Sequence, residues 1–438
     1  MTSTSDDPVP RDIEPAVSLR GEVVLPGDKS ISHRTAILAA LAQGRSTIWN
    51  YSCSEDCSRT LDCLEQLEVE ILRKPTGVEI LGRGPGGLQE PRHALYAGNS
   101  GTSMRLLAGV LAGLPFRSRL EGDDSLNSRP MARIIVPLRR MGGRIQARQG
   151  CFPPLDFSGR RLEAIEYELP VASAQVKSCV LLAGLLARGQ TTVVEPTATR
   201  NHTELLLPAF GGRITKAGTR ISLQGGQDLE ATEMEVPGDI SAASFFLVAA
   251  SLIPNSRVEL RRVGLNPTRD ALLSLLIKHG GRIEISNPDV SGGEPVGDLC
   301  VSYSARLLES FPTCIGGPQI PLLIDEIPVL AILGTRLKSG FEVTDAAELR
   351  AKESDRIRAI VHNLRSLGVE TEERNDGFQI PPGQTFRGGK VRTWGDHRIA
   401  MAFAIAGLIS EQPVVLDDAR CCGVSFPGFL EQLTSVSQ

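Results

Sequence analysis

The feature that most constrains the fold is a unit of roughly 70 residues that recurs along the 438-residue chain. Small or polar residues open each copy and an Ala/Leu-rich stretch follows, as in GDKSISHRTAILAALA from Gly27 and GNSGTSMRLLAGVLAG from Gly98. Further copies begin at Val171, Gly238, Ile324 and Gly395. Polar openings cap helices, and a helix that is apolar almost all round is buried on most sides. The repeats therefore predict six units of mixed helix and strand whose apolar helices are buried.

A second repeated pattern marks where helices end. LRRMGGRI ends at Ile145, LPAFGGRI at Ile214 and LIKHGGRI at Ile283. Each combines an apolar stretch, a glycine pair and a following Ile, which predicts a helix, a glycine-assisted stop and a strand.

The length of the chain favours two lobes of three units each, because single cores stop growing at about 250–300 residues. We assign residues 28–237 to one lobe and residues 15–27 plus 238–438 to the other. The polar, acidic residues 1–14 are expected to form a disordered tail. Helix N-termini attract anions, so several openings that face one cleft between the lobes would form a site for several anionic groups.

Composition excludes several classes of protein. Lys and Arg total 47 against 51 Asp and Glu, and aromatics are 4% of the chain, which argues against a nucleic-acid partner. No apolar run reaches the ~18 residues of a membrane helix, and the N-terminus lacks the apolar core of a signal peptide. The nine cysteines lack the paired spacing of a zinc site. We expect a cytoplasmic protein with no metal site.

Reactive side chains collect at the helix openings. Lys29 and Arg34 lie in the first opening, and Arg398 lies in the last. Arginine binds phosphate and carboxylate bidentately and lysine supplies a point charge, so this set suits anionic substrates. Asp325 lies between apolar runs in PLLIDEIPVLAIL, where a carboxylate needs a partner or has a functional pKa. The charged run RAKESDRIR, taken alone, is more typical of a solvated helix face.

At these residues the chain resembles a known family. LPGDKSISHR, GNSGTSMR, LNSRP, ASAQVKS, TRNHTE, LIDEIPVLA, RAKESDRI and WGDHRIAM occur in the order and spacing of the 5-enolpyruvylshikimate 3-phosphate (EPSP) synthases, from about Ser18 to about Leu433. The resemblance implies an α/β fold: a two-lobed inside-out α/β barrel of six βαβαββ repeats, three per lobe, with buried helices. It also implies an active site in the cleft between the lobes.

The resemblance implies a reaction as well. Members of this family transfer the enolpyruvyl group of phosphoenolpyruvate to the 5-hydroxyl of shikimate 3-phosphate, on the shikimate pathway to chorismate and the aromatic amino acids. The products are 5-enolpyruvylshikimate 3-phosphate and phosphate, and no metal or organic cofactor takes part. The expected partners are therefore the two small-molecule substrates, with no nucleic acid and no membrane, and we expect a monomer.

The family's roles can be carried over to matching positions. Asp325 is the expected base for the 5-hydroxyl, Glu353 the expected proton donor to C3 of the enolpyruvyl group, and Lys29 contacts both substrates and shares the proton transfer. The residues expected to bind shikimate 3-phosphate are Lys29, Ser30, Arg34, Ser173, Ala174, Gln175, Thr199, Arg200, Asp325 and Lys352. Those expected to bind phosphoenolpyruvate are Lys29, Asn99, Gly101, Arg129, Gln175, Arg356 and Arg398.

The chain departs from the family pattern at a few positions. Val424 stands where many members have a lysine that binds phosphoenolpyruvate, and Leu106 stands where others have proline. These departures bear on affinity more than on activity. Gly101 keeps the small residue associated with glyphosate sensitivity.

Two alternatives are less favoured. UDP-N-acetylglucosamine enolpyruvyl transferases usually have a cysteine in the mobile loop and an SGAKNA-like opening, whereas this chain has LNSRPMAR and GDKSISHR. A non-catalytic anion-binding relative is expected to have lost Lys29, Asp325, Glu353 or Arg398, and all four are present.

Overall fold

The computed structural model describes residues 8–438, which form two compact units. Unit 1 contains the described residues up to Pro26, together with Gly238–Asp289 and Val296–Gln438. Unit 2 contains Gly27–Pro237 and Val290–Pro295. The turn between β19 (Arg282–Ser291) and β20 (Glu294–Ser302) thus belongs to unit 2, although most of both strands belongs to unit 1. The prediction that all of residues 238–438 lie in one lobe is wrong for this turn.

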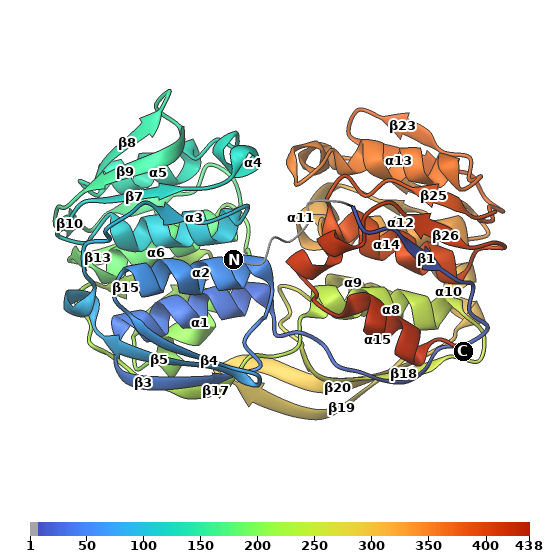
Figure 1. Cartoon of the computed structure of the whole chain (residues 1–438), viewed down its shortest axis with the longest axis horizontal. Coiled ribbons are helices and arrows are strands. Elements are labelled where there is room, and N and C mark those ends of the chain that lie inside the picture. Colours follow the sequence, from blue (N-terminus) through green and yellow to red (C-terminus); the bar gives the residue numbers. More distant parts are fainter. Residues whose placement is uncertain (1–7) are drawn as a thin grey trace. The chain divides into compact units, whose positions relative to one another are not determined.

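Two copies of a βαβαββ unit in unit 2 show how the repeat is built (Figure 1). The first consists of β6 (Leu95–Tyr96), α3 (Gly101–Leu111), β7 (Ser118–Glu121), α5 (Ala132–Arg140), β8 (Arg144–Arg148) and β9 (Phe152–Ser158). The second consists of β11 (Glu166–Glu168), α6 (Ala174–Leu185), β13 (Gln190–Val194), α7 (His202–Ala209), β14 (Ile214–Ala217) and β15 (Arg220–Gln224). In each sheet the first two strands pair in parallel across a helix, and the closing hairpin is antiparallel. A parallel pair needs such a long crossover, whereas a hairpin needs only a turn.

In the remaining copy of unit 2, the strands that pair in parallel come from the C-terminal end of the segment Gly27–Pro237. Its own elements are α1 (Lys29–Leu41), β3 (Ala42–Trp49), α2 (Glu55–Gln66), β4 (Glu70–Lys74) and β5 (Gly77–Arg83). The strands β16 (Leu229–Glu230) and β17 (Glu233–Glu235) pair in parallel with β3 and close the unit. The short elements of unit 2 are α4 (Asp124–Asn127), β10 (Leu162–Glu163) and β12 (Ala187–Arg188).

Unit 1 repeats the same pattern twice. One copy is β2 (Arg20–Val23), α8 (Ile240–Leu252), β18 (Arg257–Gly264), α9 (Ala271–Lys278), β19 and β20. The other is β21 (Cys314–Ile315), α12 (Ile327–Thr335), β22 (Phe341–Val343), α13 (Arg356–Ser366), β23 (Glu372–Arg374) and β24 (Gly377–Ile380). The short helix α10 (Ala305–Ser310) connects them, and the short helix α11 (Ile320–Leu323) lies within the second copy, between β21 and α12.

The sixth copy is incomplete. It contains β25 (Gly389–Val391), α14 (His397–Leu408), β26 (Val414–Leu416) and α15 (Phe429–Val436), and no closing hairpin follows in the described chain. Instead β1 (Arg11–Ile13) pairs antiparallel with β26 and buries Ile13. The prediction of a disordered tail over residues 1–14 is therefore wrong for this strand, and residues 1–7 lie outside the described part. The prediction of six full βαβαββ repeats is also wrong for this copy.

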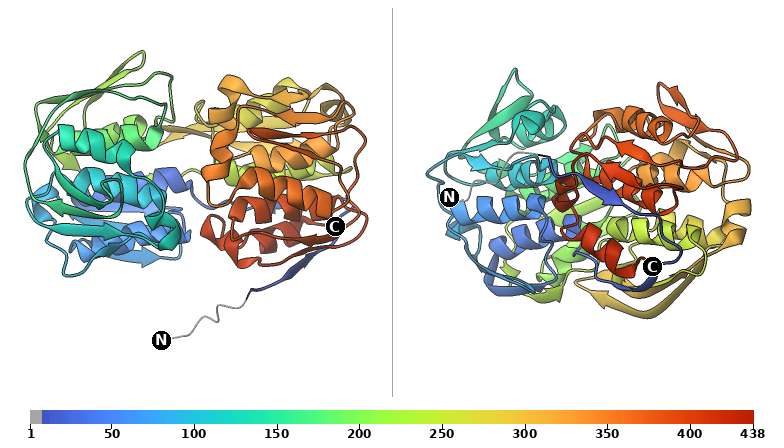
Figure 2. Two further views of the ribbon diagram at one scale, coloured as in Figure 1. Left: turned by 90° about the horizontal axis from the view of Figure 1, so that it is seen from above. Right: turned by 45° about the vertical axis from the view of Figure 1, so that its right-hand side comes forward.

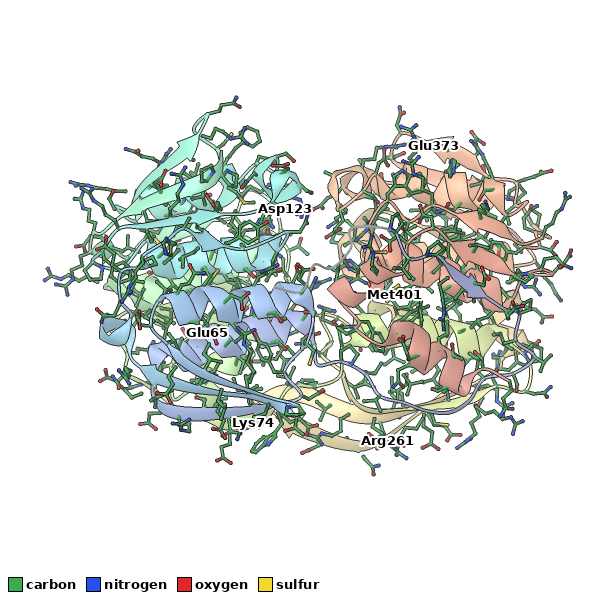
Figure 3. All side chains as sticks on the ribbon, viewed as in Figure 1. Glu65, Lys74, Asp123, Arg261, Glu373 and Met401 are labelled. Atoms are coloured by element: carbon green, nitrogen blue, oxygen red, sulfur yellow. The ribbon has the colours of Figure 1, made fainter. Side chains whose placement is uncertain are left out.

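The apolar helices lie inside each unit and the sheets lie outside them (Figures 1 and 2), as predicted. Every residue of α8 and of α12 is buried. On α14 the side chain of Met401 lies within the unit, whereas Glu373 on β23 lies at its periphery (Figure 3).

Within residues 8–438 no single helix combines the length and apolar character needed to cross a membrane. The segments Gly317–Leu323 and Ile327–Thr335 reach that length only together, across a bend of 111°.

Candidate active site

The first helix opening of unit 2 holds Lys29 and Arg34. Asp28 caps α1, and its Oδ1 accepts a hydrogen bond from the backbone N–H of Ile31 at 2.9 Å. This cap fixes the first turn, which carries Lys29 and Ser30. The ammonium of Lys29 lies 2.8 Å from Oδ2 of Asp56 in the first turn of α2. Both side chains of this pair are partly exposed. Asp56 therefore holds Lys29 in place while its ammonium stays accessible to a ligand.

Arg34 is buried, and each nitrogen of its guanidinium donates one hydrogen bond within the protein. Its Nε donates to Oγ1 of Thr203 at 3.0 Å, and its Nη2 donates to Oγ of Ser178 at 2.8 Å. Its Nη1 donates to the carbonyl of Ser30 at 2.8 Å. Burial lowers the pKa of Arg34 to about 10, with Glu204 acting in the opposite direction. The side chain therefore remains a cation at neutral pH, oriented by three partners.

The second opening presents Asn99 and Arg129 as a linked pair. The guanidinium of Arg129 donates from Nη2 to Oδ1 of Asn99 at 2.5 Å and to Oγ of Ser125 at 3.2 Å. Asn99 in turn donates from Nδ2 to Oδ2 of Asp123 at 2.7 Å. Ser100, rather than Asn99, caps α3. Asn99 is thus free of the capping role and orients Arg129.

Gln175 on α6 is held by α3. Its Oε1 accepts from Nη1 of Arg105 at 2.8 Å, and its Nε2 donates to Oγ1 of Thr102 at 2.9 Å. A Cβ at Gly101 would lie 2.6 Å from Nη1 of Arg105 and 3.8 Å from Nη1 of Arg129. Gly101 therefore lies against both guanidiniums. The sequence places Arg105 in the same helix opening, GNSGTSMR, but assigns it to neither substrate.

Thr199 and Arg200 lie in the loop before α7. Oε1 of Glu195 accepts a bond from the backbone N–H of Thr199 at 3.2 Å and another, short one, from its hydroxyl. Glu195 is itself paired with the fully buried Lys177 at 3.1 Å. Arg200 is close enough to Arg34 to lower the pKa of that guanidinium. The structure thus brings this loop together with the first opening.

In unit 1, Asp325 lies between two guanidiniums just before α12. Its Oδ1 is 3.7 Å from Nη1 of Arg356 and 3.8 Å from Nε of Arg398. Arg398 also donates from Nη1 to the backbone carbonyl of Asp325 at 3.0 Å. Asp325 is only partly exposed, and the adjoining cations favour its ionised form.

Arg356, the first residue of α13, is the buried centre of this cluster. Its Nε donates to Oδ2 of Asp396 at 2.8 Å and its Nη2 donates to Oε2 of Glu353 at 2.6 Å. Burial lowers the pKa of Arg356, but Asp396, Glu353 and Asp325 outweigh that effect and raise it. Its Nη1 is buried and makes no hydrogen bond to the described residues. That atom is a donor that a ligand could use.

Glu326 lies beside Asp325 and faces the protein interior. It accepts a hydrogen bond from the hydroxyl of Ser241 at 2.5 Å, and Arg269 donates to the same hydroxyl at 2.8 Å. Burial and the neighbouring Asp325 raise the pKa of Glu326. Of the two adjacent carboxyls, only Asp325 thus lies beside both Arg356 and Arg398.

The predicted site residues form one set in each unit. Unit 2 holds the set Lys29, Ser30, Arg34, Asn99, Gly101, Arg129, Ser173, Ala174, Gln175, Thr199 and Arg200. Unit 1 holds the set Asp325, Lys352, Glu353, Arg356 and Arg398. The side chain of Ser173 caps α6. The ammonium of Lys352 lies 3.8 Å from Oε1 of Glu348. Among residues 8–438 there is no group of three His, Cys, Asp or Glu side chains suited to a metal ion. The two sets supply carboxylates that can transfer protons and cations that can bind anions.

Known proteins match this chain over almost its whole length. The family model described as EPSP synthase (3-phosphoshikimate 1-carboxyvinyltransferase) matches residues 13–433. The 3-phosphoshikimate 1-carboxyvinyltransferase of Shouchella clausii is 48% identical, over 95% of this chain and 96% of the relative. That of Bacillus subtilis is 46% identical, over 96% of this chain and 98% of the relative. A solved EPSP synthase structure from Acinetobacter baumannii superimposes with a TM-score of 0.86 at 40% identity, covering 98% of both chains. The chain therefore belongs to the EPSP synthase family.

Proposed function

We propose that this chain transfers the enolpyruvyl group of phosphoenolpyruvate to the 5-hydroxyl of shikimate 3-phosphate. The single observation that carries the proposal is the cluster of unit 1, in which Asp325 lies between Arg356 and Arg398 while Glu353 is bound to Arg356. A base and an acid are thereby placed beside two permanent cations. Addition of a hydroxyl to an anionic enol phosphate needs these groups.

Asp325 acts as the base in this proposal. A neighbouring guanidinium limits the basicity of a carboxylate, and two guanidiniums lie within 4 Å of Asp325 in the free enzyme. The phosphate and carboxylate of phosphoenolpyruvate would neutralise those cations on binding, and the proton affinity of Asp325 would then rise. Asp325 takes the proton of the 5-hydroxyl as its oxygen forms a bond to C2.

Glu353 donates a proton to C3 in the same addition step, shared with Lys29. The C2–C3 π electrons take up that proton, so a methyl group and a tetrahedral C2 result. The bond from C2 to the phosphate oxygen then breaks, C3 returns a proton to the carboxylate of Glu353, and phosphate leaves with the proton that Asp325 had taken up. The hydrogen bond of 2.6 Å from Arg356 fixes the carboxylate of Glu353 for this transfer.

The remaining assigned residues bind the two anions. Ser30, Arg34, Ser173, Ala174, Gln175, Thr199, Arg200 and Lys352 are proposed to bind shikimate 3-phosphate. Asn99, Gly101, Arg129, Gln175, Arg356 and Arg398 are proposed to bind phosphoenolpyruvate. Each substrate would then be bound by residues of both units.

The enzyme is proposed to work as a monomer in the cytoplasm. Every residue assigned above comes from one chain, so the chemistry does not require a second copy. The near-balanced charge and the low aromatic content support small-molecule substrates over a nucleic acid.

A phosphate-release assay with product identification by mass spectrometry tests the function. Shikimate 3-phosphate with phosphoenolpyruvate should give equimolar phosphate and 5-enolpyruvylshikimate 3-phosphate. UDP-N-acetylglucosamine in place of shikimate 3-phosphate should give neither product. Turnover with the sugar nucleotide, or none with either acceptor, would refute the proposal.

A further inference from the structure

The turn that joins β19 to β20 is one part of the chain whose placement the sequence did not predict. It belongs to unit 2, although most of its two strands belongs to unit 1. Gly292 and Gly293 have positive φ angles of 56° and 85°. A Cβ at Gly292 would lie 2.4 Å from Cε of Met234, and one at Gly293 would lie 2.5 Å from the carbonyl oxygen of Leu205 on α7. The turn therefore packs directly against α7.

Glu294, the residue after this glycine pair, is 1% exposed. Its Oε1 lies 2.7 Å from Nδ1 of His202, the first residue of α7. We assign Nδ1 as the donor, because a carboxylate oxygen accepts hydrogen bonds. The other ring nitrogen of His202 is buried and has no hydrogen-bond partner among the described residues. The bond to Glu294 is thus the one polar tether of the ring in the described part of the chain.

The first turn of α7 connects this tether to the candidate site. Thr199 and Arg200 precede α7 in the chain, with only Asn201 between them and the helix. Thr203 accepts the hydrogen bond from Nε of Arg34, and its hydroxyl also shares a hydrogen bond of 2.8 Å with Ser178. A shift of His202 would therefore move the loop on one side and the partner of Arg34 on the other.

We propose that Glu294 is a positioning residue for the binding of shikimate 3-phosphate. Its hydrogen bond to His202 fixes the first turn of α7 and thereby Arg34, Thr199 and Arg200. This inference rests on the proposed function, because those three residues are the proposed ligands of that substrate. Glu294 does not touch the reacting atoms, so its loss should change substrate affinity rather than the chemical step.

Two variants separate the position of Glu294 from its charge. Glu294→Asp keeps the carboxylate but withdraws it by one methylene from His202. Glu294→Gln removes the charge but keeps an oxygen that can accept from Nδ1. We expect Glu294→Asp to raise KM for shikimate 3-phosphate about fivefold, the size of one net hydrogen bond. Glu294→Gln should leave that KM within about twofold of wild type, and both variants should keep kcat and KM for phosphoenolpyruvate within about twofold.

Ser291→Ala is the matched control on the same turn. The hydroxyl of Ser291 donates a hydrogen bond of 2.5 Å to the backbone carbonyl of Glu235. Glu235 lies outside α7. Its loss should lower the melting temperature without raising KM for shikimate 3-phosphate. An equal rise in KM for Ser291→Ala and Glu294→Asp would overturn the proposal, since any loosening of the turn would then suffice.

The other outcomes are equally decisive. A normal KM in Glu294→Asp with a raised KM in Glu294→Gln would assign the effect to charge and overturn positioning. Equal losses in kcat and in both KM values would indicate a general structural role and would also overturn it. If Glu294→Asp does not fold, the variants His202→Ala and His202→Asn test the same hydrogen bond. Asparagine keeps a donor near the position of Nδ1, so only His202→Ala should raise KM for shikimate 3-phosphate. An unchanged KM in His202→Ala would refute the inference.

Wild-type turnover distinguishes this inference from the proposed function. A wild type without turnover on shikimate 3-phosphate refutes the function, and the inference falls with it. An active wild type with unchanged KM in Glu294→Asp refutes only the inference.

Discussion

Asp325 is the residue at which the proposed reaction is most directly testable. Asp325→Asn keeps the shape of the side chain but removes its basicity. Turnover should therefore fall by roughly 10²–10⁴, while KM for both substrates changes much less. Asp270→Asn, at a half-buried carboxyl before α9, is the control and should keep wild-type turnover. Near-normal turnover in Asp325→Asn would remove Asp325 from the role of base.

Gly101 provides a test of the proposed phosphoenolpyruvate pocket. A Cβ there would lie 2.6 Å from Nη1 of Arg105, so alanine must displace the guanidinium that binds Gln175. We expect Gly101→Ala to raise the inhibition constant of glyphosate about tenfold, which corresponds to about 1.4 kcal/mol, and to raise KM for phosphoenolpyruvate less. Gly86→Ala, where a Cβ meets nothing within 4 Å, should change neither constant. An unchanged inhibition constant in Gly101→Ala would contradict this assignment of Gly101.

His33 should make stability depend on pH. Burial lowers its pKa from 6.5 to about 3, with Asp56 acting in the opposite direction. As pH falls below 6.5, the unfolded chain gains a proton at this residue that the folded chain does not bind. Stability should therefore fall by about 1.4 kcal/mol per pH unit on this account, in the window from 6.5 down to about 3. Denaturant unfolding at about pH 4, 5 and 6 should show a shallower slope in His33→Gln than in wild type.

The exposed His93 supplies the control for that slope. Water hydrates its imidazole in both the folded and the unfolded chain, so His93→Gln should reproduce the wild-type pH dependence. An identical slope in His33→Gln and wild type would show that His33 takes up its proton without unfolding.

At the scale of the element, the caps could be predicted because they depend on neighbouring residues. Asp28, Ser100, Ser173, Asp239 and Asp396 cap five of the six buried helices that the openings predicted, through local hydrogen bonds. The opening at Asp325 differs, because Glu326 precedes α12 without a side-chain cap. Its two carboxyls bond to residues of other elements instead, and no local pattern encodes such partners.

The buried Lys177 on α6 joins α7 and the loop that follows β13 in unit 2. It is fully buried on α6, and its ammonium lies 3.1 Å from Glu195 and 2.7 Å from Glu204 on α7. Lys177→Ala would leave two buried carboxylates without their cation and should destabilise the protein by about 3–5 kcal/mol in urea denaturation. Arg220→Ala is the control: it breaks an exposed ion pair with Glu166 and should leave the midpoint of urea denaturation unchanged. Equal midpoints for the two variants would contradict a structural role for Lys177.

At the scale of the molecule, repeats predicted the fold class and motifs predicted the candidate residues, but distant pairings could not be read from the sequence. Arg34 and Thr203 are 169 positions apart, and His202 and Glu294 are 92 apart. The strand β1 shows the same limit. Its three residues resemble a polar tail in the sequence, and they form a strand because β26 supplies backbone hydrogen-bond partners. Such contacts arise only when the whole chain has folded, so sequence patterns missed β1 and these two hydrogen bonds.

The division of proposed ligands between the units predicts a shared response to one substrate. If one molecule of shikimate 3-phosphate binds Arg34 in unit 2 and Lys352 in unit 1, hydrogen exchange should slow at the start of α7 and around Lys352 over the same concentration range. A ligand present at 100 times its Kd stabilises the folded protein against unfolding by about 2.7 kcal/mol, so the protection against hydrogen exchange should be large. Arg34→Ala should shift both protection curves to higher concentration by the same factor, because both report one binding event. Protection curves that shift separately would show two independent sites and would refute a shared one.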